Sequence, residues 1–264
     1  TEDGKTTVQI ELDYPAKTQG PVIEEMVRAK LVEAGIPADV KISQNIIAHE
    51  VQRGVKVFDS VRNIIAVSSG KGGVGKSTVS ANLALALQQE GAKVGLLDAD
   101  VYGPSQPTML GITDKPYSVD GKTLEPMIAH GLQVASVGVL IDPDQPMIWR
   151  GPLAVSALQQ LLKQTNWKDL DYLIVDMPPG TGDIQLSLSQ EVPLTGAVVV
   201  TTPQDIALMD ARKGLVMFEK VNVPILGIIE NMATHICSKC GHEEHIFGEG
   251  GAAKMAAQYG VDLL

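Results

Sequence analysis

From Asn63 onward, short apolar runs alternate with segments of helical periodicity, and this alternation restricts the fold more than any other feature. Strands joined through helices form a parallel sheet that is covered on both faces. We expect strands at 64–67, 93–97, 132–137, 172–175, 197–201 and 225–229, and helices at 76–90, 153–165, 205–220 and 252–259. The sequence therefore predicts an α/β fold, a doubly wound and mostly parallel sheet whose ligands bind at the carboxyl ends of the strands.

The first part of the chain has a different pattern. Residues 8–12 alternate as a strand does, residues 20–35 form an amphipathic helix, and residues 40–42 form a second short strand. A length of 264 residues suits one α/β domain with a small appendage. We therefore expect a small α+β module over 1–57 and a larger domain over 58–264.

Composition and charge exclude several classes of protein. The chain is 44% hydrophobic and 20% charged, which is typical of a globular protein, and it has no apolar stretch of about eighteen residues that could span a membrane. Its formal charge of -10 repels phosphate backbones, so we expect neither nucleic acid nor membrane as a partner. The polar residues Thr1 to Thr7 resemble neither a secretory signal nor a transit peptide, and we expect the cytoplasm as the compartment.

A glycine-rich loop follows the first strand of the larger domain and opens its first helix. It reads Gly70-Lys71-Gly72-Gly73-Val74-Gly75-Lys76-Ser77-Thr78. Glycines let backbone N–H groups wrap phosphate oxygens, Lys76 reaches the outer phosphates, and the Ser77 hydroxyl can ligate Mg²⁺. A chance glycine-rich turn is the alternative, but the preceding strand and following helix favour a P-loop that binds ATP with Mg²⁺.

Acidic residues end two of the predicted strands. Asp176 follows the apolar run 172–175, as a Walker B aspartate does for Mg²⁺, although the same pattern also occurs at helix N-caps and surface turns. Asp98 and Asp100 lie on the same side of their strand, where one could orient the Mg²⁺ shell and the other the attacking water. Solvated strand-end aspartates are the alternative. Residues 177–183 fit a loop that responds to the terminal phosphate.

Cys237 and Cys240 are the only cysteines, and their C-x-x-C spacing points to metal or redox chemistry rather than to a disulfide framework. Thiolates are the ligands that iron-sulfur clusters prefer, and a cubane takes about four. One chain supplies two of them, so a homodimer with both pairs near its symmetry axis would complete the set.

Zinc is an alternative for the same residues, because His242 and His245 lie just beyond the cysteines. Zinc-finger histidines are usually about three to five residues apart, whereas only two residues separate these, so a tetrahedral site would be strained. The histidines are then loop residues. A dithiol redox pair is the third interpretation.

The loop G-K-G-G-V-G-K-S-T resembles the deviant Walker A motif of MinD/ParA-like (SIMIBI) ATPases, in which the early lysine acts across a nucleotide-sandwich dimer. The motifs at 97–105, 147–152 and 176–183, with the cysteine pair, resemble the Mrp/ApbC family of iron-sulfur cluster carriers over residues 60–264. Residues 1–57 resemble, less specifically, the latter part of a small cluster-assembly module. Relative to that family the module starts partway, and the chain stops at Leu264 where the family continues, as expected of a truncated fragment.

The resemblance implies a role for each matching residue. Lys71 is the signature lysine, Asp100 positions water, and Asn231 reads adenine. The implied catalytic residues are Lys71, Lys76, Asp100 and Asp176. The implied nucleotide-binding residues are Gly70, Lys71, Gly72, Gly73, Val74, Gly75, Lys76, Ser77, Thr78 and Asn231. The implied metal ligands are Ser77, Asp98 and Asp176 for Mg²⁺, and Cys237 and Cys240 for a [4Fe-4S] cluster.

The resemblance also implies a function: a homodimeric carrier, with slow ATP hydrolysis coupled to loading or transfer of the cluster. Its expected partners are apo iron-sulfur proteins and cluster assembly scaffolds. A positioning or scaffold ATPase that binds membrane or DNA is an alternative from another class. The acidic charge argues against DNA, and the sequence shows no basic amphipathic helix for a membrane. A zinc-binding regulatory ATPase is a further alternative.

Overall fold

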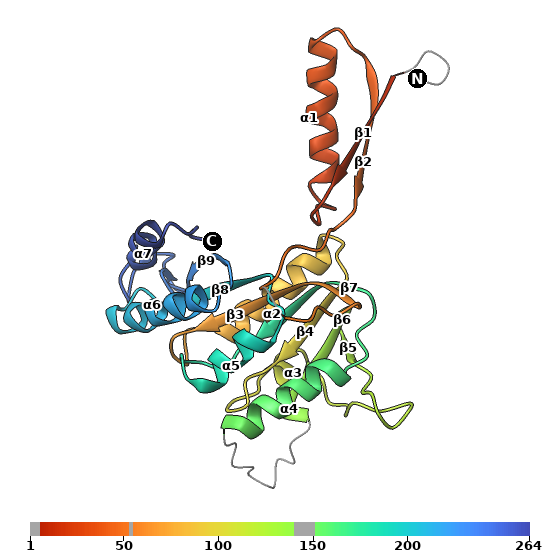
Figure 1. Ribbon diagram of the computed structural model, residues 1–264. Helices are drawn as coiled ribbons and strands as arrows, with labels where there is room; N and C mark the ends of the chain where they lie inside the picture. The colour runs from red at the N-terminus through yellow and green to blue at the C-terminus, as the bar shows by residue number, and fades with distance from the viewer. Residues whose placement is uncertain (1–5, 53–54, 140–150) are drawn as a thin grey trace.

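A computed structural model describes residues 6–52, 55–139 and 151–264. Its N-terminal part is a small module of β1 (Thr6–Leu12), α1 (Gly20–Glu33) and β2 (Ala38–Gln44). The two strands pair in parallel, from Thr6 opposite Ala38 to Leu12 opposite Gln44, and α1 connects them. This β-α-β unit projects from the larger domain (Figure 1).

The module is joined to the larger domain by contacts at Glu90. The backbone N–H of Lys17 donates to the Glu90 carbonyl at 3.1 Å, and the Thr18 hydroxyl donates to the Glu90 carboxylate at 2.6 Å. Beyond the module, Ile46 packs in the core of the larger domain, and buried Gln52 bonds to the backbone of Ser189 and Leu194. Residues 45–52 therefore pack on the larger domain, although they precede the boundary at residue 57 expected from the sequence.

The larger domain is built on a seven-stranded sheet. Its strands in spatial order are β5 (Met127–Ala129), β6 (Leu132–Ser136), β4 (Val94–Asp98), β7 (Leu170–Asp176), β3 (Val61–Ser69), β8 (Gly196–Thr201) and β9 (Ile225–Glu230). Each pairs in parallel with its neighbour except the edge strand β5, which runs antiparallel to β6. This arrangement confirms the predicted α/β class with a mostly parallel sheet.

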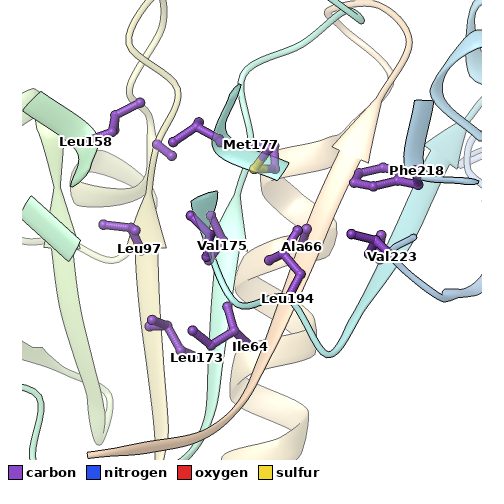
Figure 2. Packing of buried hydrophobic residues seen from close by; sticks show 14 of the residues in the cluster. Ile64, Ala66, Leu97, Leu158, Leu173, Val175, Met177, Leu194, Phe218 and Val223 are labelled. Carbon is purple, nitrogen blue, oxygen red and sulfur yellow. The ribbon is translucent and has the colours of Figure 1, made fainter. Parts of the chain in front are cut away.

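Helices cover both faces of the sheet. They are α2 (Lys76–Gln89), α3 (Gln106–Met109), α4 (Gly151–Gln164), α5 (Asp183–Glu191), α6 (Asp205–Lys220) and α7 (Gly251–Tyr259), with a 3-10 turn at Val137–Val139. On one face Leu158 of α4 and Phe218 of α6 pack with strand residues such as Val175 (Figure 2). On the other face α2 packs through Ala84 against a separate apolar cluster that includes Leu96.

The elements beyond the predicted pattern include β5, α3 and α5. In α5 the apolar residues Ile184, Leu186 and Leu188 recur at every second position, which is the period of a strand. Residues 147–150 of the family motif lie outside the described residues, whereas Gly151 and Pro152 begin α4. Among the described residues, no helix is long and apolar enough to cross a membrane.

Sheet pairing brings the predicted acidic residues together. Asp98 at the end of β4 is the register partner of Asp176 at the end of β7, and Val67 of β3 pairs with Asp176 on its other side. The loop from β3 into α2 leaves from this same edge. The topology therefore places the glycine-rich loop and the carboxylates at one point, the carboxyl edge of the central strands.

Candidate nucleotide and cluster site

The glycine-rich loop requires glycine at specific positions. Gly73 and Gly75 have φ angles of +81° and +89°, which residues with a side chain rarely adopt. A Cβ at Gly70 would lie 2.2 Å from the backbone of Asp210 on α6, and one at Gly75 would lie 2.2 Å from Nδ2 of Asn231. The loop therefore approaches two other segments too closely for a larger residue.

The remaining loop residues differ in exposure. Gly72, Gly73 and Thr78 are exposed, Val74 is buried, and Lys71 and Ser77 are half-buried. The Lys71 carbonyl accepts a hydrogen bond from the Ser69 hydroxyl at 2.9 Å. The exposed backbone at the start of α2 is suited to an anion, because the first N–H groups of a helix have no partner within it.

Lys76 joins the loop to the two acidic strand ends. Its side chain is 6% exposed, and Nζ lies 2.7 Å from Oδ1 of Asp176, 3.5 Å from Oδ2 of Asp100 and 3.3 Å from the Ser77 hydroxyl. The structure thus brings together Lys76, Ser77, Asp100 and Asp176 from three separate elements. A buried ammonium ion needs such partners, because its desolvation would otherwise be costly.

Two residues at Asp176 were not found by sequence reasoning. The Ser80 hydroxyl donates to Oδ1 of Asp176 at 2.9 Å, and the Gln106 side-chain amide donates to Oδ2 at 2.9 Å. Ser80 lies four residues after Lys76 on α2, so helical spacing could have indicated it. No sequence signal marks Gln106.

Asp98 faces protein donors. Its Oδ1 accepts from the backbone N–H of Asp100 at 3.2 Å, and its Oδ2 accepts from the backbone N–H of Gln106 at 3.1 Å and the Ser136 hydroxyl at 3.0 Å. Burial, and then the nearby charge of Asp176, raise the pKa of Asp98 to about 6. Both carboxylate oxygens of Asp98 are thus held by protein donors, and the contact with Mg²⁺ expected from the sequence stays a prediction.

The donor set fits a magnesium ion. The Ser77 hydroxyl and the carboxylates of Asp100 and Asp176 are hard oxygen ligands of the kind that Mg²⁺ prefers. In addition, Oε1 of Gln106 is a buried acceptor without a partner among the described residues. Hydration water of a bound cation could satisfy such an acceptor.

The loop after β7 is tied to the end of β3. The backbone N–H of Gly180 donates to the Ser69 carbonyl at 2.9 Å. Buried Gln185 donates from its side-chain amide to the Pro178 carbonyl and to the Ser68 hydroxyl, the latter at 3.2 Å. The segment expected to respond to a terminal phosphate therefore lies beside the start of the glycine-rich loop.

Asn231 lies on the other side of this loop, just after β9. Its backbone N–H donates to the Thr201 carbonyl at 2.8 Å, and its side-chain amide donates to the Val74 carbonyl at 2.9 Å. The residue expected to read adenine is thus in direct contact with the P-loop.

Cys237 and Cys240 lie in the turn of a small antiparallel hairpin, β10 (His235–Ile236) and β11 (Glu243–Glu244). The backbone N–H of Cys237 donates to the His242 carbonyl at 2.9 Å, and that of Gly241 donates to the Cys237 carbonyl at 2.8 Å. Both thiols are free, with Cys237 half-buried and Cys240 exposed. Backbone N–H groups of Lys239 and then Cys240 lower the pKa of Cys237, which favours the thiolate that binds metals.

His245 is engaged away from the cysteines. Its Nδ1 lies 2.6 Å from the Ala233 carbonyl and its Nε2 lies 2.9 Å from the Glu249 carboxylate. The Ala233 carbonyl is the main reason that the pKa of His245 is raised. In the ranges 6–52, 55–139 and 151–264, no group of three or more His, Cys, Asp or Glu side chains is placed to hold a metal ion.

The cysteine segment is anchored at both ends by consecutive residues. Asn231 holds its start against Val74, and the carboxylate of Glu230 accepts bonds from the backbone N–H groups of Gly250 at 2.9 Å and Ala252 at 2.5 Å. Both anchors lie at the end of β9. The cysteine hairpin and the nucleotide loop therefore share one attachment point.

Most of the chain is similar in sequence to known proteins. Residues 60–264 match the family described as ParA: NUBPL iron-transfer P-loop NTPase. The chain belongs to this family. An iron-sulfur cluster carrier protein of Pseudomonas fragi is 60% identical over 229 residues, covering 86% of this chain and 80% of the relative. The iron-sulfur cluster transfer protein NUBPL of Mus musculus is 52% identical over 211 residues, covering 79% and 66%.

Solved structures of P-loop proteins show the same fold. A nucleotide-binding protein of Archaeoglobus fulgidus in complex with ADP is 40% identical, with a TM-score of 0.68, covering 78% of this chain and 81% of that one. The cell division ATPase MinD of Pyrococcus furiosus is 22% identical with a TM-score of 0.55, covering 76% and 81%, and this likeness concerns the fold alone. Membership of the iron-transfer NTPase family confirms the resemblance found in the sequence and the predicted class of function.

Proposed function

We propose that this chain is an ATP-hydrolysing carrier that holds a [4Fe-4S] cluster between two copies of itself and delivers it to apo iron-sulfur proteins. The observation that carries the proposal is the shared anchor at the end of β9, where Glu230 and Asn231 fix the cysteine segment beside the P-loop. The names of the related carriers support the cargo, and the ADP complex of the Archaeoglobus protein supports the nucleotide.

The P-loop residues would hold the nucleotide. The backbone N–H groups at the start of α2 and the ammonium of Lys76 face the same edge of the sheet as Asp100 and Asp176. Ser77 and Asp176 would hold Mg²⁺, which when bound neutralises phosphate charge. Lys76 would exchange part of its contact with Asp176 for the outer phosphates.

Hydrolysis needs a positioned water and a cation near the terminal phosphate. Asp100 is suited to orient the water, because its Oδ1 is fixed by the backbone N–H groups of Tyr102 and Gly103 while its Oδ2 faces Lys76. Lys71, on the half-buried start of the loop, would supply the second cation to the opposite copy. Slow turnover is expected if ATP acts as a switch.

The number of cysteines favours a cluster that is shared between two chains. Each chain contributes two thiols in an exposed turn, and a cubane takes about four. Because His245 is bonded to Ala233 and Glu249, it does not face the pair as a further ligand. Two hairpins that meet at a twofold axis would complete the set, and a cluster held in exposed turns can be released.

The two sites would be coupled through the segment that joins them. A nucleotide that draws the P-loop toward its phosphates also acts on Val74 and thus on Asn231, which begins the cysteine segment. A change at the nucleotide site can therefore alter how two hairpins meet. Through this coupling, ATP binding or hydrolysis would control how the two hairpins hold the cluster.

Anaerobic reconstitution with iron and sulfide tests the proposal, with absorbance, native mass and ADP affinity recorded on the wild type, Cys237→Ala and the neighbouring control His242→Ala. We expect the wild type and His242→Ala to form a cluster-bearing dimer. Cys237→Ala should form none while it keeps its ADP affinity. A colourless wild-type protein, or a cluster that persists in Cys237→Ala, would reject the carrier function, whereas loss of cluster in His242→Ala would favour a mixed cysteine-histidine metal site.

A further inference from the structure

Gln106 occupies a junction between three parts of the nucleotide site. Its side-chain Nε2 donates to the Ser77 carbonyl at 2.9 Å and to Oδ2 of Asp176 at 2.9 Å. Its backbone N–H donates to Oδ2 of Asp98 at 3.1 Å. One residue at the start of α3 thus contacts the start of α2 and the ends of β7 and β4.

The orientation of this amide is fixed by its neighbours. Both groups that face Nε2 are acceptors, so exchanging the amide nitrogen and oxygen would set Oε1 against a carboxylate and a carbonyl. The amide is therefore fixed with Nε2 toward Ser77 and Asp176 and with Oε1 pointing away from them. Gln106 is 0% exposed, and this oxygen has no hydrogen-bond partner among the residues that the structure describes.

A buried acceptor of this kind requires a donor, because leaving it unpaired is costly. Nε2 holds the backbone carbonyl of Ser77 and the carboxylate of Asp176, and these are the two residues proposed to contact Mg²⁺, Ser77 through its hydroxyl. Hydrated Mg²⁺ usually keeps several of its waters, and these are strong donors. The unpaired oxygen therefore lies on a residue that already contacts both metal-binding elements.

We propose that Gln106 is a positioning residue for magnesium: Nε2 fixes Ser77 and Asp176 relative to each other, and Oε1 accepts a hydrogen bond from the hydration shell of the ion. This inference rests on the proposed nucleotide function and deepens it, because it assigns the metal affinity of the site to a residue outside the P-loop and acidic motifs. Groups that orient metal ligands in this way typically change metal affinity by about 10- to 100-fold when they are removed.

Magnesium-dependent binding of a fluorescent ADP analogue tests the inference. We define the Mg²⁺ midpoint as the Mg²⁺ concentration that produces half of the maximal increase in affinity for the analogue. For Gln106→Met we expect this midpoint to rise about 10- to 100-fold. In EDTA, the affinity of the same variant for the analogue should stay within about twofold of the wild type, because Gln106 contacts the loop at the Ser77 carbonyl, an acceptor that cannot donate to phosphate.

Two further variants make the test decisive. Gln52→Met removes another buried amide, which bonds to Ser189 and to Leu194 just before the start of β8, at the opposite end of that strand from the carboxyl edge, and it should leave the Mg²⁺ midpoint unchanged. Gln106→Asn keeps the amide but shortens the side chain by one methylene, so that it cannot bridge the Ser77 carbonyl and Asp176. Its Mg²⁺ midpoint should therefore rise as well, while its affinity in EDTA stays within about twofold of the wild type.

An unchanged Mg²⁺ midpoint in Gln106→Met, or an equal loss of affinity with and without the metal, overturns the inference. If Gln106→Met does not fold, an unchanged Mg²⁺ midpoint in Gln106→Asn overturns it instead. The wild type separates this outcome from failure of the proposed function: a wild type that binds no analogue, or binds it without any Mg²⁺ effect, contradicts the nucleotide proposal itself.

Discussion

The ammonium group of Lys76 lies 2.7 Å from the carboxylate of Asp176, a residue 100 positions away, and both side chains are buried. The pair joins the start of α2 to the end of β7, and Asp100 adds a second carboxylate 3.5 Å from the same nitrogen. The loop that would hold the nucleotide is therefore fixed to the residues that would hold Mg²⁺ and water.

Removing the cation from this cluster should destabilise the fold. Lys76→Met leaves Asp176 buried without its ammonium partner, and breaking a buried pair from one side typically costs about 3–5 kcal/mol. Urea unfolding at neutral pH measures the loss. The double variant Lys76→Met/Asp176→Leu should lose less than Lys76→Met alone, since no orphaned charge remains at Asp176, and a double variant at least as unstable as the single one would contradict the ion-pair argument.

Gly75→Ala should impair both the fold and nucleotide binding. The added Cβ would lie 2.2 Å from Nδ2 of Asn231 on a residue whose φ is +89°, and a left-handed alanine costs roughly 1–2 kcal/mol from backbone strain alone. Gly72→Ala is the matched control, because nothing lies within 4 Å of its Cβ position. Thermal unfolding and ADP titration of both variants check this. Equal stability of the two would contradict the close approach of Asn231.

The buried carboxyl group of Asp98 should make stability depend on pH. Its pKa is about 6 in the folded protein against an ordinary value of 3.8, so the folded state binds more protons between these values and stability falls as pH rises through that window. The decrease is on the order of 3 kcal/mol. Relative to the wild type, Asp98→Asn should gain stability from pH 4 to pH 7, although it loses hydrogen bonds at every pH. Urea unfolding across this range measures the difference, which would be constant if Asp98 did not titrate there.

The thiolate of Cys237 should depend on one backbone N–H group. The N–H of Lys239 is the main cause of the lowered pKa of Cys237, and Lys239→Pro removes this donor. We expect the pH midpoint of Cys237 alkylation in metal-free protein to rise in Lys239→Pro. Lys239→Ala keeps the N–H and removes only the charge, so its midpoint should match the wild type. Equal shifts in both variants would assign the effect to the lysine charge instead.

The sequence predicts those parts of the molecule whose pattern is local. Apolar runs were enough for the six parallel strands of the sheet, although not for the edge strand β5, and they placed the glycine-rich loop and Asp176 at strand ends. They failed for α5, because Ile184, Leu186 and Leu188 have the spacing of a strand and become helical only through packing against α4 and the sheet. Contacts made across the chain, such as Gln106 to Asp176 or Gln52 to Leu194, leave no local signal. The hydrogen bonds that occupy Asp98 likewise depend on Ser136 of a neighbouring strand.

The shared attachment of the two sites predicts a defect in coupling. Asn231→Ala removes the bond to Val74 while leaving both cysteines and Lys76 in place. We expect this variant to form a cluster but to lose most of the effect of ATP on its release, because the hairpin no longer follows the P-loop. Release to a chelator, timed with and without ATP, measures this. A variant whose release still responds to ATP as the wild type does would place the coupling elsewhere.

The central claim is that one cluster is held by thiolates of two copies, and subunit mixing tests it most directly. Wild-type protein is allowed to exchange subunits with an equal amount of Cys237→Ala/Cys240→Ala, and the cluster content is measured after anaerobic reconstitution. If both copies are needed, random pairing leaves only about a quarter of the dimers competent, so the content falls to about a quarter of that in the same total amount of wild-type protein. A content of about half would show that each chain holds its own cluster, and would contradict the account.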